Sequence, residues 1–256
     1  MPFQKIHPEK LCDAVVNQIE LLILRGILRP SERLPPEREL SDKLGVSRPS
    51  LRDAVAQLQE RGLLESRAGA GIFVTQELGS AFSKPLIALF ASHDEAVLDY
   101  LSFRRDMEGM AAYRAARHGT DGDLEVIDTL LHKMEAAHEL RNPAEEARLD
   151  ADFHMAIIEA SHNVIMLHMM RAMYQLLREG VFYNRQIMFR QRSTRNTLLD
   201  HHRKIAHALR ARDSEGAQSA VEAHLDYVLD ALEESRNTAG HEVIARQRLE
   251  RERGRT

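Results

Sequence analysis

Four polar side chains interrupt the apolar faces of predicted helices, at positions where a helical core normally places hydrophobic residues. Asp150 and His154 lie four residues apart, so both point to the same side of one helix. His202 and His224 interrupt two further apolar stripes in the same manner. The apolar residues that mark these three faces are Phe153 and Ile157, then Leu198, Ile205 and Leu209, and then Ala217, Val221, Val228 and Leu232.

Burial of four such groups is unfavourable unless a common partner satisfies them. One divalent metal ion would do so, and three imidazoles with one carboxylate suit zinc best, with nickel and manganese as alternatives. A single buried histidine is more often an ordinary core residue, so this expectation depends on the group of four. His201 also borders the stripe and is the alternative to His202, whereas Asp152 points elsewhere.

Arg104 enters an otherwise apolar stripe in the predicted helix 95–116. A buried guanidinium needs a carboxylate partner, which it can bind through two parallel hydrogen bonds. Glu108, one helical turn further on, is one candidate partner. The other candidate is the carboxylate of a bound organic acid.

A second group of residues suits nucleic acid. Pro35 and Pro36 begin a predicted helix that Gly45 ends, and Ser47 caps the next helix, whose buried face carries Leu51, Val55 and Leu58. Arg48 and Arg52 then lie together on the exposed side of its first turns, where the second helix of a helix-turn-helix meets a major groove. After Gly62, a glycine-rich tip between two short apolar runs predicts a two-stranded wing, in which Gly69 and Gly71 would let the backbone approach DNA closely.

Length and composition are consistent with two mainly helical domains. The chain has 256 residues, only 5% aromatic residues and a net charge of −4. The first 76 residues carry 11 Lys and Arg against 10 Asp and Glu, so DNA binding must rest on where the arginines lie and not on overall charge. The single cysteine, Cys12, excludes an internal disulfide and is expected to be a small buried side chain. No signal peptide or membrane-spanning stretch is apparent, so we expect a cytoplasmic protein.

The elements follow from the order of apolar stripes and turn residues. A first helix over 10–25 would bury Leu11, Val15, Ile19 and Leu22 and end at Gly26. We expect a DNA-binding domain at 1–76, a linker at 77–84, a helical domain at 85–236 and a charged, partly ordered tail at 237–256. Within the helical domain, breaks are predicted at 92–95, 118–123, 141–142, 162–163, 191–195 and 212–216, and no sheet is expected.

The string LPPERELSDKLGVSRPSLRDAVAQLQERGLL, followed by GAGIFV, resembles the winged-helix domain of GntR-type bacterial regulators. That resemblance implies three helices and a small β-hairpin. It also implies that Arg38, Arg48, Arg52 and Gly69 contact operator DNA.

Asp150 with His154, followed by DHHRKIAHALRARDSEGAQSAVEAHL, resembles the FCD ligand-binding domain of the FadR-like branch of that family. The resemblance implies an all-α antiparallel bundle in which Asp150, His154, His202 and His224 hold a metal. It further implies that Arg104 helps to bind a small organic acid whose carboxylate also reaches the metal.

The expected protein is therefore a transcriptional regulator, most simply a repressor, that binds an inverted-repeat operator as a homodimer and is released by its acid. Strings such as KIHPEKLCDAVVNQIELLILRGILRPSERLPPEREL are similar to regulators of pyruvate dehydrogenase genes, which favours pyruvate as the acid. Regulators that respond to L-lactate or glycolate are the alternative. A metalloenzyme that uses the Asp/His site to activate water is a second alternative, from a different class.

Overall fold

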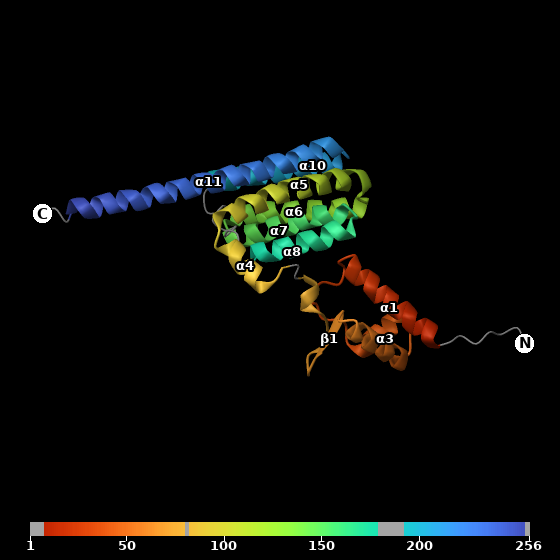
Figure 1. Cartoon of the computed structure of the whole chain (residues 1–256). Helices are drawn as coiled ribbons and strands as arrows, with labels where there is room; N and C mark the ends of the chain where they lie inside the picture. The colour runs from red at the N-terminus through yellow and green to blue at the C-terminus, as the bar shows by residue number, and fades with distance from the viewer. Residues whose placement is uncertain (1–7, 80–81, 179–191, 254–256) are drawn as a thin grey trace, which may run out of the picture. The chain divides into compact units, whose positions relative to one another are not determined.

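The computed structural model describes residues 8–79, 82–178 and 192–253 (Figure 1). Backbone contacts divide the chain into two compact units. The first consists of residues 1–83 with the segment 167–175, and the second of residues 84–166 with 176–256. None of the helices within the described ranges is long and apolar enough to cross a membrane.

Capping residues fix the turn between the second and third helices of the first unit. Gly45 ends the second helix in the left-handed conformation, with φ of 64°. Ser47 caps the third by accepting a hydrogen bond from the amide of Ser50 at 3.3 Å. Both signals were predicted, and together they determine which side of the third helix faces outward. The three helices are α1 (Pro8–Leu24), α2 (Glu37–Leu44) and α3 (Arg48–Glu60).

The buried face of α1 differs from the predicted one. Leu11 is 44% exposed, and the neighbouring Cys12 is buried in its place, as expected for that small side chain. Val15 and Ile19 are buried as predicted, and the stripe ends on Ile23 instead of Leu22. Because α1 carries apolar residues at adjacent positions, helical periodicity alone allows either of two neighbouring faces.

The wing of the first unit is an antiparallel hairpin of β1 (Leu64–Arg67) and β2 (Gly71–Val74), visible at the label β1 in Figure 1. It confirms the predicted hairpin. A third short segment, which was not predicted, pairs with β2 through a bridge between Arg33 and Phe73. The Leu34 amide also donates to the carbonyl of Ile72 at 2.9 Å, so the hairpin is anchored to the chain before α2.

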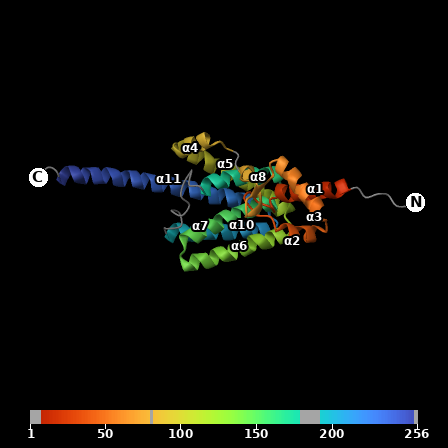
Figure 2. The ribbon, with the colours of Figure 1, turned by 90° about the horizontal axis from the view of Figure 1, so that it is seen from below.

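The second unit is helical throughout its described part, and the views in Figures 1 and 2 show its helices lying side by side. Helix α5 packs against α7 and α11, α10 packs against α6 and α11, and α6 packs against α7. The bundle that these contacts build confirms the predicted all-α architecture. The elements are η1 (Gln76–Gly79), α4 (Lys84–Ala91), α5 (Asp94–His118), α6 (Asp121–Leu140), α7 (Pro143–Ala160), α8 (Val164–Arg178), α10 (Arg192–Arg210) and α11 (Ser214–Arg253), where η1 belongs to the first unit and α8 spans the division.

Local signals set the start of α7, the helix that carries two of the candidate ligands. Arg141 ends α6 in the left-handed conformation, with φ of 53°. Asn142 then caps α7 by accepting a hydrogen bond from the amide of Glu145 at 3.2 Å, and Pro143 occupies the first turn. These residues fix where the helix begins, and therefore which of its side chains point into the bundle.

Five of the predicted breaks fall at gaps between described helices. The break at 191–195 adjoins residues outside the described ranges, and α10 already begins at Arg192. The linker predicted at 77–84 contains part of the 3-10 helix η1. The segment 237–253, predicted as a separate, partly ordered tail, instead continues α11 without interruption. Its four Arg and three Glu residues favour helix even without an apolar stripe.

Candidate metal centre and DNA-binding surface

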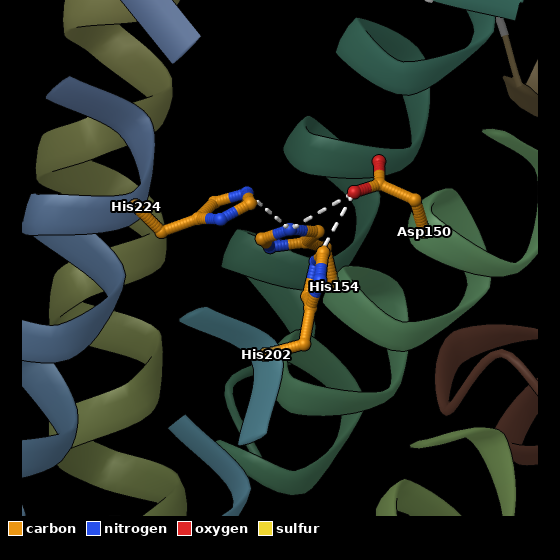
Figure 3. A group of neighbouring side chains, drawn as sticks. All are labelled: Asp150, His154, His202 and His224. Carbon is orange, nitrogen blue, oxygen red and sulfur yellow. Dashed lines mark hydrogen bonds and ion pairs between the residues drawn. The ribbon is translucent and has the colours of Figure 1, made fainter. Parts of the chain in front are cut away.

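Asp150 and His154 of α7 meet His202 of α10 and His224 of α11 inside the second unit (Figure 3). All four side chains are buried, with exposed fractions of 4%, 1%, 0% and 1% respectively. One ligand atom from each residue lies within 4.8 Å of the others. The structure therefore brings together the four residues that the sequence singled out.

The separations between these atoms fit a common centre. His154 Nε2 lies 3.2 Å from His224 Nε2 and 3.8 Å from Asp150 Oδ1. His202 Nε2 lies 3.1 Å from the same Asp150 oxygen. Two atoms that ligate one ion at about 2.0–2.1 Å are separated by roughly 3.0–3.5 Å. The four side chains thus need little rearrangement to share one divalent cation.

The protonation of His224 also suits a cation. Burial lowers the pKa of His224 well below its ordinary value, and the neighbouring His202 and His154 lower it further. The ring is therefore neutral, the form in which imidazole offers a lone pair to a metal. Its Nε2 faces the centre, 3.2 Å from His154 Nε2, and its buried Nδ1 has no hydrogen-bond partner among the described residues.

An apolar surround encloses the four ligands. The ring of Phe153 lies edge-on to His154 and to His202, with centroids 5.9 Å and 5.1 Å apart. Ile157 and Ile205, which mark the predicted stripes, are both fully buried. Such surroundings strengthen electrostatic interactions at the centre and leave an unsatisfied polar group unfavourable.

His201 and Asp152 lie outside the group of four. His201 is only half-buried, and its ring contacts Tyr227 edge-on with centroids 5.3 Å apart. Asp152 forms an ion pair with Arg148 at 2.5 Å on the exposed side of α7. The geometry favours His202 over His201, because His202 groups with the other three candidate ligands and its Nε2 lies 3.1 Å from Asp150 Oδ1.

Arg104 of α5 is buried beside this cluster and is paired with Glu108, the intramolecular partner considered from sequence. Arg104 Nε donates to Glu108 Oε1 at 2.6 Å, and Nη2 donates to Oε2 at 3.4 Å. Burial by itself would raise the pKa of Glu108, but the Arg104 guanidinium and His154 bring it down to about 2. Glu108 is therefore a charged carboxylate, and its Oε2 also lies 2.8 Å from His154 Nδ1. Sequence patterns missed this second contact because α5 and α7 are far apart in the chain.

The candidate DNA-contacting arginines all lie on the surface of the first unit. Arg38 on α2 is exposed, as are Arg48 and Arg52 at the start of α3. Arg52 Nε donates to Glu37 Oε2 at 3.0 Å, an ion pair between the two helices of the helix-turn-helix that sequence analysis did not identify.

The wing carries Gly69 at its tip, with φ of 70° and open space where a side chain would project. Gln59 of α3 donates to Ser66 of β1 at 2.6 Å, which fixes the hairpin relative to α3. The guanidinium of Arg67 stacks over the ring of Phe73, 4.4 Å from its centroid. These contacts hold the hairpin against the C-terminal end of α3.

Comparison with protein families gives two matches that together span most of the chain. The pattern described as "Bacterial regulatory proteins, gntR family" matches residues 11–74. The pattern described as "FCD domain" matches residues 99–227, which include all four buried ligand candidates.

Individual relatives are similar over nearly their whole length. An Escherichia coli K12 protein described as an L-lactate dehydrogenase operon regulatory protein is 34% identical over 227 residues, covering 87% of this chain and 86% of its own. The Glc operon transcriptional activator of the same strain is 32% identical, covering 91% and 93%. Among solved structures, Streptococcus agalactiae GntR aligns with a TM-score of 0.55 and 25% identity, covering 86% of this chain and 99% of that chain.

Proposed function

The chain belongs to the GntR family of bacterial regulatory proteins, and on that premise we propose that it is a metal-containing, acid-responsive repressor that binds an inverted-repeat operator as a homodimer. The observation that carries the proposal is the buried cluster of Asp150, His154, His202 and His224, four polar groups arranged as ligands around one point. Its matched families and relatives are transcriptional regulators and not enzymes, so a metalloenzyme role is set aside.

Operator binding is assigned to residues 1–76, with Arg38, Arg48, Arg52 and Gly69 as the contacting residues. Arg48 and Arg52 are exposed at the start of α3, where bidentate contacts to guanine are geometrically favourable. One winged helix reads only a short half-site, so two copies related by a two-fold axis would read an inverted repeat. Residues 77–84 are assigned as the linker.

The helical domain, residues 85–236, is assigned metal binding, effector binding and dimerisation, and 237–256 the charged end of the chain. A carboxylate with three imidazoles suits zinc, with nickel or manganese as alternatives. When bound, the metal would supply a Lewis-acidic position for an oxygen of the effector. Asp150, His154, His202 and His224 would hold it and exclude bulk water from that side.

Arg104 is assigned to the effector because it is a buried cation next to the cluster. An incoming carboxylate would have to compete with Glu108 for the guanidinium, so small acids that also bind the metal are favoured. The relatives named for lactate dehydrogenase and Glc operons favour a 2-hydroxy acid, L-lactate or glycolate, over pyruvate. An acid can release DNA only if it prefers a conformation in which the DNA-binding units do not fit the operator.

The test is a titration of operator binding with the three acids. An operator is first selected from random duplexes, and its complex with zinc-loaded protein is followed by fluorescence anisotropy at fixed salt. Release by L-lactate or glycolate at concentrations where pyruvate has little effect supports the proposal. Release by pyruvate alone would restore the first expectation for the acid, and no release by any of the three would overturn the proposed effector class.

A matched pair of arginine variants tests the effector site. In Arg104→Ala, release by the acid should be lost while operator binding without acid is retained. The control is Arg105→Ala, which removes the adjacent arginine, whose partly exposed side chain pairs with Asp226 at 2.6 Å. An unchanged acid response in Arg104→Ala would contradict the assignment of Arg104.

A further inference from the structure

Glu108 lies between Arg104, assigned to the effector, and His154, a candidate metal ligand. Its Oε1 accepts from Arg104 Nε at 2.6 Å, and its Oε2 lies 2.8 Å from the Nδ1 of His154. Glu108 and His154 are each 1% exposed, so water does not compete for these contacts. A ligand histidine is thus held from behind by a carboxylate, on the ring nitrogen that faces away from the cluster.

The charge of Glu108 determines where His154 carries its proton. If Nδ1 were deprotonated, its lone pair would face a carboxylate oxygen at 2.8 Å in a buried environment, which is strongly repulsive. The Nδ1–H tautomer replaces that repulsion with attraction, although the ring must turn slightly to align the N–H with the oxygen. With the proton on Nδ1, Nε2 keeps its lone pair and faces Asp150 and His224.

We propose that Glu108 is a positioning residue of the metal centre: it holds the proton of His154 on Nδ1 and thereby directs Nε2 toward the metal. This inference rests on the metal site of the proposed function. It goes beyond that proposal by adding an outer-shell residue from a helix, α5, that supplies none of the four ligands. Outer-shell carboxylates of this kind orient metal-bound histidines and increase their basicity.

A second buried carboxylate in the same unit provides a matched control. Glu146 accepts from Arg195 at 2.7 Å and lies 3.5 Å from the Nδ1 of His138, the same three residue types as Arg104, Glu108 and His154. Glu146 is also buried, at 4% exposure. The histidine beside Glu146, His138, is not one of the four clustered residues. Glu146→Gln therefore removes a buried negative charge without altering a candidate ligand.

The replacement Glu108→Gln has a specific expected effect. Arg104 donates to both side-chain oxygens of Glu108, most closely to Oε1, so the amide oxygen of Gln would stay with Arg104. The amide NH2 would then face His154 Nδ1 and favour the tautomer with the proton on Nε2. In that tautomer Nε2 has no lone pair for the metal, so the proton would have to move back to Nδ1 before the metal could bind.

The first measurement is the tautomer of His154 in the metal-free protein, read from long-range ¹H–¹⁵N spectra of ¹⁵N-histidine-labelled full-length chain. The His154 signals are assigned by their loss in His154→Asn. Wild-type protein should show the Nδ1–H form, Glu108→Gln the Nε2–H form, and Glu146→Gln the wild-type pattern. A wild-type His154 protonated on Nε2 would overturn the proposal even if the Glu108 variant failed to fold.

The second measurement is zinc affinity, by competition with a chromophoric chelator. Glu108→Gln should bind zinc about 10- to 100-fold more weakly, the usual range for outer-shell partners, while Glu146→Gln should stay within about three-fold of wild type. Equal affinity in wild type and Glu108→Gln would refute the positioning role and leave the metal site intact. Absence of zinc binding by wild-type protein would instead refute the metal site itself, so the two failures are distinguishable.

Discussion

His154 and His224 face each other with their Nε2 atoms 3.2 Å apart, although 70 positions separate them in the chain. Two imidazoles in this arrangement can share at most one hydrogen bond, and Asp150 Oδ1 lies 3.8 Å from the same nitrogen of His154. A divalent cation satisfies both rings and the carboxylate at once. The relationship therefore favours a ligand set over three unrelated core histidines.

Replacement of one ligand should remove metal-dependent stability. For wild-type protein, zinc at about 100 times its dissociation constant should add roughly 2.7 kcal/mol to the free energy of unfolding. His202→Ala should lose this increment, with an affinity loss greater than the roughly 100-fold expected for outer-shell changes. Thermal melts with and without zinc measure this increment in stability. The adjacent His201→Ala should retain the increment, and equal losses in the two variants would speak against the chosen ligand.

If the start of α3 contacts bases, the exposed arginines at the two ends of this helix should differ in their effect on DNA binding. Arg48→Ala should weaken binding to the selected operator by about 10- to 100-fold and affect a scrambled duplex much less. Arg61→Ala should have little effect, because Arg61 lies at the far end of α3 and pairs with Glu20 at 2.5 Å. Anisotropy titrations at one salt concentration provide the comparison. Equal losses on both duplexes would assign Arg48 to phosphate contact only.

The sequence predicted those features that depend on local signals. Gly45 and Ser47 define the turn before α3, and the four-residue spacing of Asp150 and His154 places both on one helix face. The choice of His202 over His201 also followed from its position in the apolar stripe. These outcomes require only the helical period and capping preferences.

Features that depend on contacts between distant segments were not predicted. The approach of Glu108 to His154 joins α5 to α7, and the pair of Glu37 with Arg52 joins α2 to α3. The face of α1 was mistaken at Leu11 because adjacent apolar residues fit two faces equally well. Sequence periodicity defines a face but does not say what packs against it.

The pair of Glu37 with Arg52 predicts an effect on the discrimination between operator and other DNA. A carboxylate beside the arginine repels phosphates and restrains the guanidinium, so Glu37→Gln should strengthen binding to scrambled duplex. It should also steepen the salt dependence by about one phosphate contact, a change of roughly 0.9 in the logarithmic slope. The ratio of operator affinity to scrambled-duplex affinity should fall.

The control for this change is Glu39→Gln, which removes a neighbouring acid that pairs with Lys43 at 2.7 Å on the same helix. Both variants alter net charge equally, so a purely global charge effect would change both alike. Identical salt slopes for the two variants would mean that Glu37 has no special relation to Arg52 in the DNA complex.

Gly69 allows the contribution of backbone conformation to be separated from that of DNA contact. At φ of 70°, alanine would strain the hairpin by about 1–2 kcal/mol, whereas asparagine tolerates this conformation better. Gly69→Ala should therefore lower the melting temperature more than Gly69→Asn. Apart from the two neighbouring residues, no atom lies within 4 Å of the added Cβ, so backbone strain and not a steric clash is the expected cause. If the tip approaches DNA closely, both variants should weaken operator binding, including the more stable Gly69→Asn. Operator affinity that follows stability alone, with Gly69→Asn close to wild type, would remove Gly69 from the DNA contact surface.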